Sequence, residues 1–547
     1  MERGISILGT LVLLLIAFLM SNNKKRIDFK LVFWGIGLQT VFAVLILKTE
    51  AGRELFSFFN DVIIGLLNLA QKGAGFVFGA LINNTIPVGS GFVGDAPLSA
   101  VQPNTVAYTG AMFAFKVLPT IIFFSSLMAV LYHIGFMQKI IAVVARIMAV
   151  TMKTSGSESL SAAANIFVGQ TEAPLVIKPY LKKMTNSELM AIMTGGMATV
   201  AGGVMAAYVA MLKDSFPNIA GHLMAASIMS APAALLIAKI MIPETEESET
   251  KGIIKTEMEK VDPNVIGAAA RGAGEGLHLA LNVGGMLMAF IALVALGNQI
   301  IVLCGHGASY LKGMDPYGAY IRTTDIKKPV FPGDFISVKK VPEKGDLKMK
   351  ITSVEKKGDI TLLGFTGNDA IYNRYKNLSF TIEGPEKQVK KSMKLHKGKK
   401  KEAGSNPIIQ KSIGKDLQFG GGFHWTLTAI LGFIFAPLAW VMGVPWVDCK
   451  IIGNLFGQKL VLNEFVAYGN LGQILATGKH VLQERSVIIA TYALCGFANF
   501  SSIAIQIGGI GAIAPSRKAD LAKLGLKSMI AGAIAAFMTA TIAGMII

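Results

Sequence analysis

Long runs of apolar and small residues alternate with short polar or basic segments along most of the chain. An α-helix needs about 20 predominantly apolar residues to cross a bilayer. The pattern therefore predicts eight membrane-spanning helices, at residues 5–20, 31–47, 106–134, 189–212, 222–242, 277–303, 487–514 and 528–547. An apolar amphipathic stretch at residues 62–81 is predicted to form an interfacial helix.

Basic residues indicate which ends of these helices face the cytoplasm. The first run is followed by "NNKKR" (residues 22–26) without a small-x-small cleavage site, so the first helix is predicted to remain uncleaved. The last two runs are joined by "PSRKADLAKLGLK" (residues 515–527). Because cytoplasmic loops carry an excess of Lys and Arg, both basic segments are placed inside and both termini outside.

Residues 153–183 make a segment that is long enough for one crossing but is interrupted in its middle. The interruption reads "VGQTEAPL", in which Gly169 and Pro174 bracket three polar residues. Proline lacks a backbone donor and disfavours helix for the residue before it. Each half keeps about 12 residues, too few to cross. With basic residues at both ends, the segment is predicted to be a re-entrant hairpin, its tip buried in protein or facing a water-filled cavity.

A second interrupted segment, residues 448–480, repeats this pattern near the end of the chain. It contains "GQKLVLNEFVAYGN", where an amide and a carboxylate stand in an apolar stretch punctuated by glycine. By the count of spans, this hairpin enters from outside. Each hairpin precedes a span broken by small and polar residues, "GGMATVAGGV" (195–204) and "GFANFSSIAIQIGG" (496–509). This is the pattern of an inverted-repeat secondary transporter, whose site lies where discontinuous helices meet.

Composition agrees with a membrane protein. Of the 547 residues, 52% are hydrophobic and only 16% are charged, and the mean hydropathy is +0.53. Soluble domains carry about 25% charged residues. The 59 glycines fit close helix packing in a bilayer. The three cysteines lie far apart in sequence and indicate neither a disulfide framework nor a zinc site.

The carboxylates in the two hairpins are the strongest candidates for function. A charged group within the membrane costs about 2.5 to 3.5 kcal/mol on insertion scales, so Glu172 and Glu464 are predicted to have a role beyond packing. Two structural alternatives stay open. One is a structural ion pair between Lys459 and Glu464, and the other is that Asn499 and Ser502 only hold helices together.

The motifs together resemble the concentrative nucleoside transporter family. "GQTEAPL", "NEFVAY" and "GFANFSSIAI" occur in the order and positions typical of that family, and "FAPLAWVMGVPW" (435–446) resembles the stretch before its second hairpin. The similarity covers residues 1–305 and 421–547. It implies a sodium-coupled nucleoside symporter that works by alternating access, assembles as a homotrimer and transports uridine, adenosine and related nucleosides.

The candidate site residues suit the chemistry of a nucleoside, and the resemblance implies the same assignment. Vicinal ribose hydroxyls donate well to a carboxylate, so Glu464 with Asn499 and Ser502 suits the ribose. The polar trio of the first hairpin suits the base edge, directly or through water. Two apolar side chains of the broken spans suit the rings. The full set is Gln170, Thr171, Glu172, Val204, Glu464, Phe497, Asn499 and Ser502.

Uphill transport needs a coupling ion. Sodium takes hard oxygen ligands, which unwound backbone carbonyls beside an amide or a hydroxyl supply. The resemblance implies Asn165, the carbonyl of Val168, Thr199 and the carbonyl of Val200 as the sodium ligands. Sodium bound there is expected to order the hairpin tip, so that each ligand raises the affinity of the other. A proton-coupled relative would need no such oxygen cage, and proton coupling stays open as the alternative.

Residues 307–420 depart from the family. "DIKKPVFPGDFISVKKV", "LKMKITSVEKK", "DITLLGFTG" and "LSFTIEG" are short alternating stretches separated by turn residues, which predicts a small inserted β-rich domain. Between residues 311 and 419 there are 23 Lys and Arg against 12 Asp and Glu, a net +11 of the chain's +18. Long loops translocate largely regardless of charge, and the count of spans places this domain outside, in the periplasm of a Gram-negative cell. The basic stretch 394–407 is taken as a solvated linker, with contact to anionic lipid as the alternative and no nucleic acid expected.

The sequence therefore predicts an all-α polytopic protein of the cell (inner) membrane with eight spans, two opposed re-entrant hairpins and one inserted extramembrane domain. It is predicted to be a transporter and not an enzyme. A membrane-embedded enzyme that uses Glu172 and Glu464 as an acid/base pair, or a channel, is the competing class. The predicted domains are 1–106 (scaffold helices and interfacial helix), 107–306 (transport core with the first hairpin), 307–420 (insert) and 421–547 (second interfacial helix, second hairpin and last two helices).

Overall fold

A computed structural model describes the chain as two compact units. The first unit comprises Met1–Ile291 and Ile430–Ile547, and the second comprises Ala292–Ala429. The described residues are 2–83, 85–87, 106–108, 113–252, 262–306, 427–476 and 482–547, together with the seven strands of the second unit whose bounds are given below.

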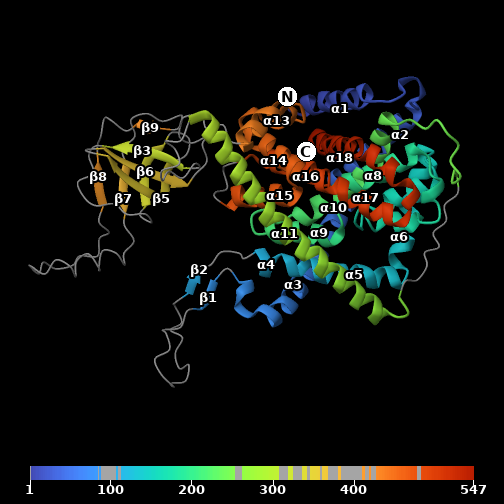
Figure 1. Ribbon diagram of the computed structural model, residues 1–547, viewed down its shortest axis with the longest axis horizontal. Helices are drawn as coiled ribbons and strands as arrows, with labels where there is room; N and C mark the ends of the chain where they lie inside the picture. The colour runs from blue at the N-terminus through green and yellow to red at the C-terminus, as the bar shows by residue number, and fades with distance from the viewer. Residues whose placement is uncertain are drawn as a thin grey trace, which may run out of the picture. The chain divides into compact units, whose positions relative to one another are not determined.

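The first unit is helical (Figure 1). Its helices before the second unit are α1 (Glu2–Leu19), α2 (Phe29–Lys48), α3 (Glu50–Phe78), α4 (Phe113–Lys116), α5 (Leu118–His133), α6 (Phe136–Met152), α7 (Gly156–Ala164), α8 (Asn186–Ala198), α9 (Gly202–Leu212), α10 (Ile219–Met241) and the first part of α11 (Val265–His306). Those after it are most of α13 (Leu427–Val441), then α14 (Cys449–Val461), α15 (Glu464–Ala476), α16 (Glu484–Leu494), α17 (Phe500–Ile513) and α18 (Lys518–Ile546).

Seven helical segments among the described residues have the length and apolar composition needed to cross a membrane. They are Glu2–Leu19, Phe29–Lys48, Glu50–Ile82, Ala114–His133, Asn186–Leu212, Ile219–Met241 and Pro515–Ile546. Six of the eight predicted spans coincide with six of these segments. The predicted span 277–303 lies within the 42-residue helix α11, and the predicted span 487–514 is divided between α16 and α17.

Two predicted boundaries are wrong. Val106–Tyr108, predicted as the start of a span, is strand β2, which pairs antiparallel with β1 (Thr85–Pro87), and helix begins only at Phe113. The stretch predicted as helix from residue 62 belongs to α3, which starts at Glu50 because Oγ1 of Thr49 caps it by accepting from the backbone N–H of Gly52 at 2.9 Å. The Thr49 cap is a sequence signal that apolar patterning alone does not register.

Burial separates central from peripheral helices. Of the most apolar 18 residues in each segment, 94% are buried in α10 and 83% in the segment that contains α18, but only 28% in α1 and in α2. α18 packs against α1, α8, α10 and α16, and Figure 1 shows it among them. On α1 the large side chains Ile7, Leu11 and Leu19 are exposed. An apolar surface of this kind fits contact with lipid, so the central helices are protected by protein and the outer ones face the bilayer.

The first interrupted segment begins with a short helix and does not resume as an α-helix. α7 starts at a capping box in which Ser155 and Glu158 satisfy each other's backbone N–H groups, and it ends at Ala164. After the break come two 3-10 turns, η3 (Ala173–Ile177) and η4 (Leu181–Lys183). Pro174 stands in the first turn of η3, where a missing donor costs least. The break falls where the sequence predicts it, whereas the second arm is shorter and less regular than predicted.

The second interrupted segment has two α-helical arms. α14 ends at Val461 and α15 starts at Glu464, so the break comprises Leu462 and Asn463. Oδ1 of Asn463 accepts from the backbone N–H of Val466 at 3.0 Å and caps α15. The carboxylate of Glu464 therefore lies at the first turn of a helix, directly after the chain reversal.

The second unit contains a seven-stranded antiparallel sheet in the order β8-β7-β4-β5-β6-β3-β9. Its strands are β3 (Gly318–Thr323), β4 (Phe335–Val341), β5 (Gly345–Lys357), β6 (Ile360–Thr366), β7 (Phe380–Glu383), β8 (Ile409–Ser412) and β9 (Gln418–Gly420). Four of them, β4 to β7, coincide with the four alternating stretches of the sequence. The basic stretch 394–407 lies outside the described residues.

Candidate functional site

Two broken helices cross at one point. The segment α8–α9 is interrupted at residues 199–201, and α16–α17 at residues 495–499. Gly496 lies in the second break with φ +116°, and a Cβ there would stand 2.8 Å from the carbonyl of Ala198, just before the first break. Only glycine accepts both this backbone angle and this approach. The crossing therefore brings two sets of broken-helix ends together inside the first unit.

The carboxylate of Glu464 is held at this crossing by two neutral donors. Glu464 is 3% exposed. Its Oε1 accepts from the hydroxyl of Tyr208 at 2.9 Å, and its Oε2 accepts from Nδ2 of Asn499 at 2.9 Å. These bonds stabilise and orient the carboxylate without neutralising its charge.

Asn499 joins the second hairpin to α17. Its Oδ1 caps the helix by accepting from the backbone N–H of Ser502 at 3.0 Å and also accepts from the hydroxyl of Ser501 at 2.6 Å. Because the oxygen faces the helix N-terminus, the amide nitrogen faces Glu464. The orientation of the side chain is thus determined by the backbone.

The first hairpin reaches the same place through Gln170. Its Nε2 donates to the hydroxyl of Ser502 at 3.2 Å, and its Oε1 accepts from Nε2 of Gln506 at 3.1 Å. A continuous hydrogen-bonded path therefore links both interrupted segments and both broken helices. We call it the site network; its members are Tyr208, Glu464, Asn499, Ser502, Gln170 and Gln506.

The remaining candidates surround this network without hydrogen bonding to it. Thr171 packs on α17, where a Cβ on Gly509 would lie 2.6 Å from its Cγ2. Val204 is buried in α9, and Phe497 is half-buried in the second break. Glu172 is exposed, and its Oε2 accepts from the backbone N–H of its neighbour Gly169 at 2.7 Å.

Glu172 is not joined to Glu464 by hydrogen bonds among the described residues. The charged groups that act on its carboxylate are Arg271 and Glu275 of α11. The first interrupted segment is connected to the site network by the amide of Gln170. The carboxylate of Glu172 does not make this connection.

The residues predicted to bind sodium lie where the first hairpin meets the first broken helix. The backbone N–H of Gly202 donates to the carbonyl of Phe167 at 3.0 Å, which ties the two breaks together. Asn165 is 1% exposed, yet neither Oδ1 nor Nδ2 has a hydrogen-bond partner. A Cβ on Gly195 would stand 3.2 Å from that Nδ2. Since buried polar groups are rarely left unpaired, the amide of Asn165 is a candidate for contact with a ligand.

The other three residues of the sodium set are also buried. The hydroxyl of Thr199 donates to the carbonyl of Gly195 at 2.9 Å, which leaves the hydroxyl oxygen able to accept or to coordinate. Val168 and Val200 are 8% and 0% exposed. Oxygen-bearing groups from both breaks thus occur in one buried region. Oxygen is the ligand type that sodium needs.

The structure removes one alternative for Glu464. Lys459 is fully buried, but its ammonium donates to the carbonyls of Ala493 at 2.7 Å and Cys495 at 3.3 Å, and no ion pair with Glu464 is found in the described part of the chain. The alternative of a structural ion pair is not found there, because the carbonyls of Ala493 and Cys495 at the break in α16–α17 already accept from the ammonium.

Sequence reasoning missed Tyr208 and Gln506. Gln506 stands within the motif "GFANFSSIAIQIGG", where a glutamine inside a span is itself a signal for a functional residue. Tyr208 stands in the apolar run "GGVMAAYVAML" without a polar neighbour, and nothing in its sequence context marks it.

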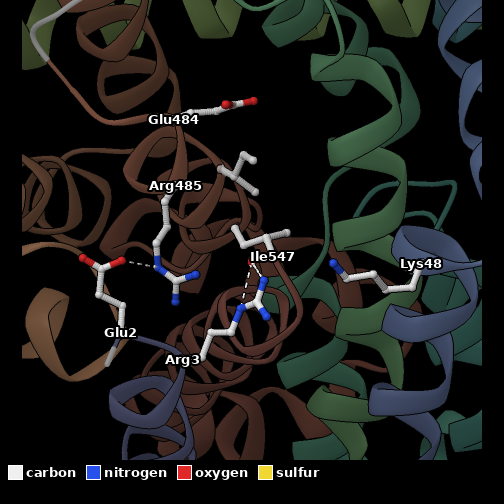
Figure 2. A pocket seen from close by; sticks show the side chains of 7 residues that line it. Glu2, Arg3, Lys48, Glu484, Arg485 and Ile547 are labelled. Carbon is white, nitrogen blue, oxygen red and sulfur yellow. Dashed lines mark hydrogen bonds and ion pairs between the residues drawn. The ribbon is translucent and has the colours of Figure 1, made fainter.

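A separate pocket of about 580 Å³ lies at the ends of α1, α2, α16 and α18. Figure 2 shows Arg485 turned toward Glu2, with 3.5 Å between Nε and Oε2, and Arg3 bonded to the backbone oxygen of Ile547. The pocket shares no residue with the site network. Its lining is Glu2, Arg3, Lys48, Glu484, Arg485, Ile488 and Ile547.

These features define a class: a multi-pass membrane protein with a candidate site at the crossing of discontinuous helices, which is the arrangement typical of secondary transporters. Family comparisons then identify the family. The model described as Na+ dependent nucleoside transporter N-terminus matches residues 8–81, and the one described as its C-terminus matches residues 222–316 and 408–544. A model described as nucleoside recognition ("Gate") matches residues 114–215. The chain belongs to the concentrative nucleoside transporter family, whose members are transporters and not enzymes, and which uses Na+ as coupling ion.

Individual relatives support the same family assignment. An uncharacterized transporter of Haemophilus influenzae is 38% identical over 99% of this chain and 97% of its own length. Solute carrier family 28 member 3 of Mus musculus is 33% identical over the whole chain, which spans 59% of the mouse protein. The solved structure of CNTnw in an inward-facing substrate-bound state has a TM-score of 0.69 and 33% identity, covering 100% of this chain and 98% of CNTnw.

Proposed function

We propose that this protein imports nucleosides by coupling their movement to sodium and alternating access between the two sides of the membrane. The observation that carries the proposal is the site network, in which Gln170 of the first hairpin and Glu464 of the second meet at the start of α17. A bound molecule would contact both hairpins at once. Its binding energy would therefore depend on how the hairpins stand relative to each other, as transport requires.

The chemistry of the site network suits a nucleoside. Glu464 accepts hydrogen bonds only, and ribose hydroxyls donate, so the carboxylate with Asn499 and Ser502 is assigned to the ribose. Gln170, with Thr171 and the exposed Glu172, is assigned to the base edge. Val204 and Phe497 are assigned to apolar contact with the rings.

The sodium site is assigned to Asn165, the carbonyl of Val168, Thr199 and the carbonyl of Val200. Support comes from the unpartnered buried amide of Asn165 and from the bond between Phe167 and Gly202 that ties the two breaks together. Sodium bound there would hold the first hairpin against α8–α9 and so preorganise Gln170 for the nucleoside.

The membrane arrangement completes the proposal. Both interrupted segments are assigned as re-entrant hairpins of an inverted repeat, and α11 and the divided segment α16–α17 as spans beside the apolar helices. The sheet of the second unit is assigned to an inserted domain outside the cell (inner) membrane, periplasmic in a Gram-negative cell. The working form is assigned as a homotrimer in contact with membrane lipids.

The test is uptake of labelled uridine and adenosine into proteoliposomes, with an imposed gradient of sodium, of protons or of neither. Accumulation above the outside concentration that requires the sodium gradient is the expected result, and Glu464→Gln should abolish it. Accumulation that follows the proton gradient would favour the proton-coupled alternative. Equilibration without accumulation would indicate a channel, and no entry of either nucleoside would overturn the proposal.

A further inference from the structure

The backbone determines the orientation of Gln506, as it does that of Asn499, and Gln506 in turn orients Gln170. It lies in α17 and is 0% exposed. Its Nε2 donates to the main-chain carbonyl of Met193 in α8 at 3.0 Å and to Oε1 of Gln170 at 3.1 Å. Both N–H groups of its amide are therefore used.

The polarity of this arrangement follows from the carbonyl of Met193. A main-chain carbonyl can only accept, so the atom of Gln506 that faces Met193 must be its nitrogen. The same nitrogen reaches the side chain of Gln170, so the atom of Gln170 that faces it must be oxygen. If the amide of Gln170 turned around, its nitrogen would face the nitrogen of Gln506, and two donors would oppose each other. The bond to Gln506 therefore holds the amide in one orientation.

The fixed orientation of Gln170 determines where its amide nitrogen points. Its Nε2 donates one hydrogen to Ser502, and its second N–H has no partner among the described residues. Gln170 is 8% exposed, so part of its surface remains accessible. The side chain therefore presents a donor to a molecule in the site, and its acceptor is turned toward α17.

Gly196 leaves the space in which the side chains of Gln506 and Gln170 meet. A Cβ at this position of α8 would stand 2.7 Å from Nε2 of Gln506 and 2.8 Å from Cβ of Gln170. Any larger residue would separate the two amides. The α8 helix thus supplies both the carbonyl that sets the polarity and the space in which the two amides meet.

We propose that Gln506 is a specificity-positioning residue: through Met193 it fixes Gln170 as a hydrogen-bond donor, so that the site selects a base edge bearing an acceptor at that point. This inference rests on the proposed nucleoside site. It assigns Gln506 no contact with the nucleoside, only control over the polarity of Gln170.

The test compares nucleosides that exchange an acceptor for a donor on the same ring. Uridine bears a carbonyl where cytidine bears an amino group, and inosine and adenosine differ in the same way. For the wild-type protein in proteoliposomes, at least one pair is expected to differ in KM by about two- to tenfold, the value of one hydrogen bond. The ring nitrogen beside the exchanged group changes in the opposite sense, so the favoured form is the one whose acceptor, carbonyl oxygen or ring nitrogen, faces Gln170. Gln506→Met should bring that ratio to near one, because Gln170 is then free to turn.

Controls separate positioning from packing. Gln39→Met removes an equally buried amide from α2, and like Gln506 it has an Oε1 without a partner, so it should leave the ratio unchanged. If Gln506→Met does not fold, Gly196→Ala serves as the second variant, since its methyl group would stand 2.7 Å from Nε2 of Gln506 and 2.8 Å from Cβ of Gln170 and would push the two side chains apart, which should reduce the ratio likewise.

In a Gln170→Met background, Gln506→Met should change the ratio no further, because the two residues act as one unit. A wild-type ratio of one for both pairs, or a ratio that survives both Gln506→Met and Gly196→Ala, overturns the inference while leaving nucleoside transport intact. Absence of all nucleoside uptake by the wild-type protein would instead overturn the proposed function.

Discussion

The hydroxyl of Tyr208 donates to the carboxylate of Glu464 at 2.9 Å, across 256 positions of sequence. The tyrosine belongs to the helix that follows the first hairpin, and the glutamate to the second hairpin. The ring of Tyr208 is stacked on Tyr468, with centroids 4.4 Å apart. A carboxylate placed for function is thus oriented by a side chain that is itself immobilised by packing.

Removing the Tyr208 hydroxyl should weaken substrate binding. Tyr208→Phe keeps the ring and its stacking but leaves Oε1 of Glu464 without a donor. A hydrogen bond to a charged group is worth about 1.5 to 3 kcal/mol, so KM for uridine uptake should rise by about tenfold or more. Tyr468→Phe is the matched control, because its hydroxyl donates to the carbonyl of Thr491 at 2.7 Å and not to the carboxylate. Equal KM values for both variants would contradict the role of Tyr208.

Asn165 should control the response to sodium. Asn165→Ala removes the unpartnered buried amide, and uridine uptake is expected to lose its dependence on external sodium because one oxygen ligand is gone. The measurement is the initial rate of uptake against sodium concentration at fixed uridine. Asn60→Ala is a suitable comparison, since Asn60 of α3 is also buried and its Oδ1 also lacks a partner. A folded Asn165→Ala protein with unchanged sodium dependence defeats the assignment.

A buried ion pair secures the base of the first hairpin. Lys239 of α10 pairs with Glu158 of α7, both nearly inaccessible, and also donates to Ser187 at 2.9 Å. Lys239→Met leaves Glu158 as an unpaired buried charge, which typically costs about 3 to 5 kcal/mol. The melting temperature of the purified protein in detergent should fall accordingly, and adding Glu158→Gln should restore part of the loss.

The control for that experiment is an exposed ion pair. Lys183 and Glu249 lie 3.1 Å apart, with side chains 68% and 53% exposed. Lys183→Met should shift stability by about 1 kcal/mol at most, because solvent screens surface pairs. Equal losses for Lys239→Met and Lys183→Met would show that burial of the first pair has no energetic effect.

The crossing of the two broken helices should not tolerate a side chain. Gly496→Ala places a Cβ 2.8 Å from backbone atoms of Ala198 at a φ of +116°, so both folding and uptake should be severely impaired. Gly508→Ala in α17 has nothing within 4 Å and should leave the protein unchanged or slightly more stable. Thermal melting and uptake of the two variants give the comparison, and a stable, active Gly496→Ala would refute the crossing.

Local signals in the sequence were enough to locate the interrupted segments and most of the long helices. Pro174 and the glycines interrupt apolar runs where the structure has breaks, because proline and glycine change the backbone at their own position. The alternating stretches likewise coincide with β4 to β7, since side-chain alternation is a property of each strand alone. The start of α3 and the strand at Val106–Tyr108 were missed because a cap and a strand pairing leave little trace in hydrophobicity.

The partners within the site were decided only by the tertiary structure. Glu464 was identified from its sequence context, yet its donor Tyr208 stands in an unremarkable apolar run, and Gln170 and Gln506 are 336 positions apart. A hydrogen bond requires donor and acceptor to lie within about 3 Å with suitable direction, and sequence spacing does not encode that between distant segments. The sequence by itself therefore determined where the helices are interrupted and which polar residues stand at the breaks, because these are local signals, whereas the crossing of α8–α9 with α16–α17 determined which of those residues lie together.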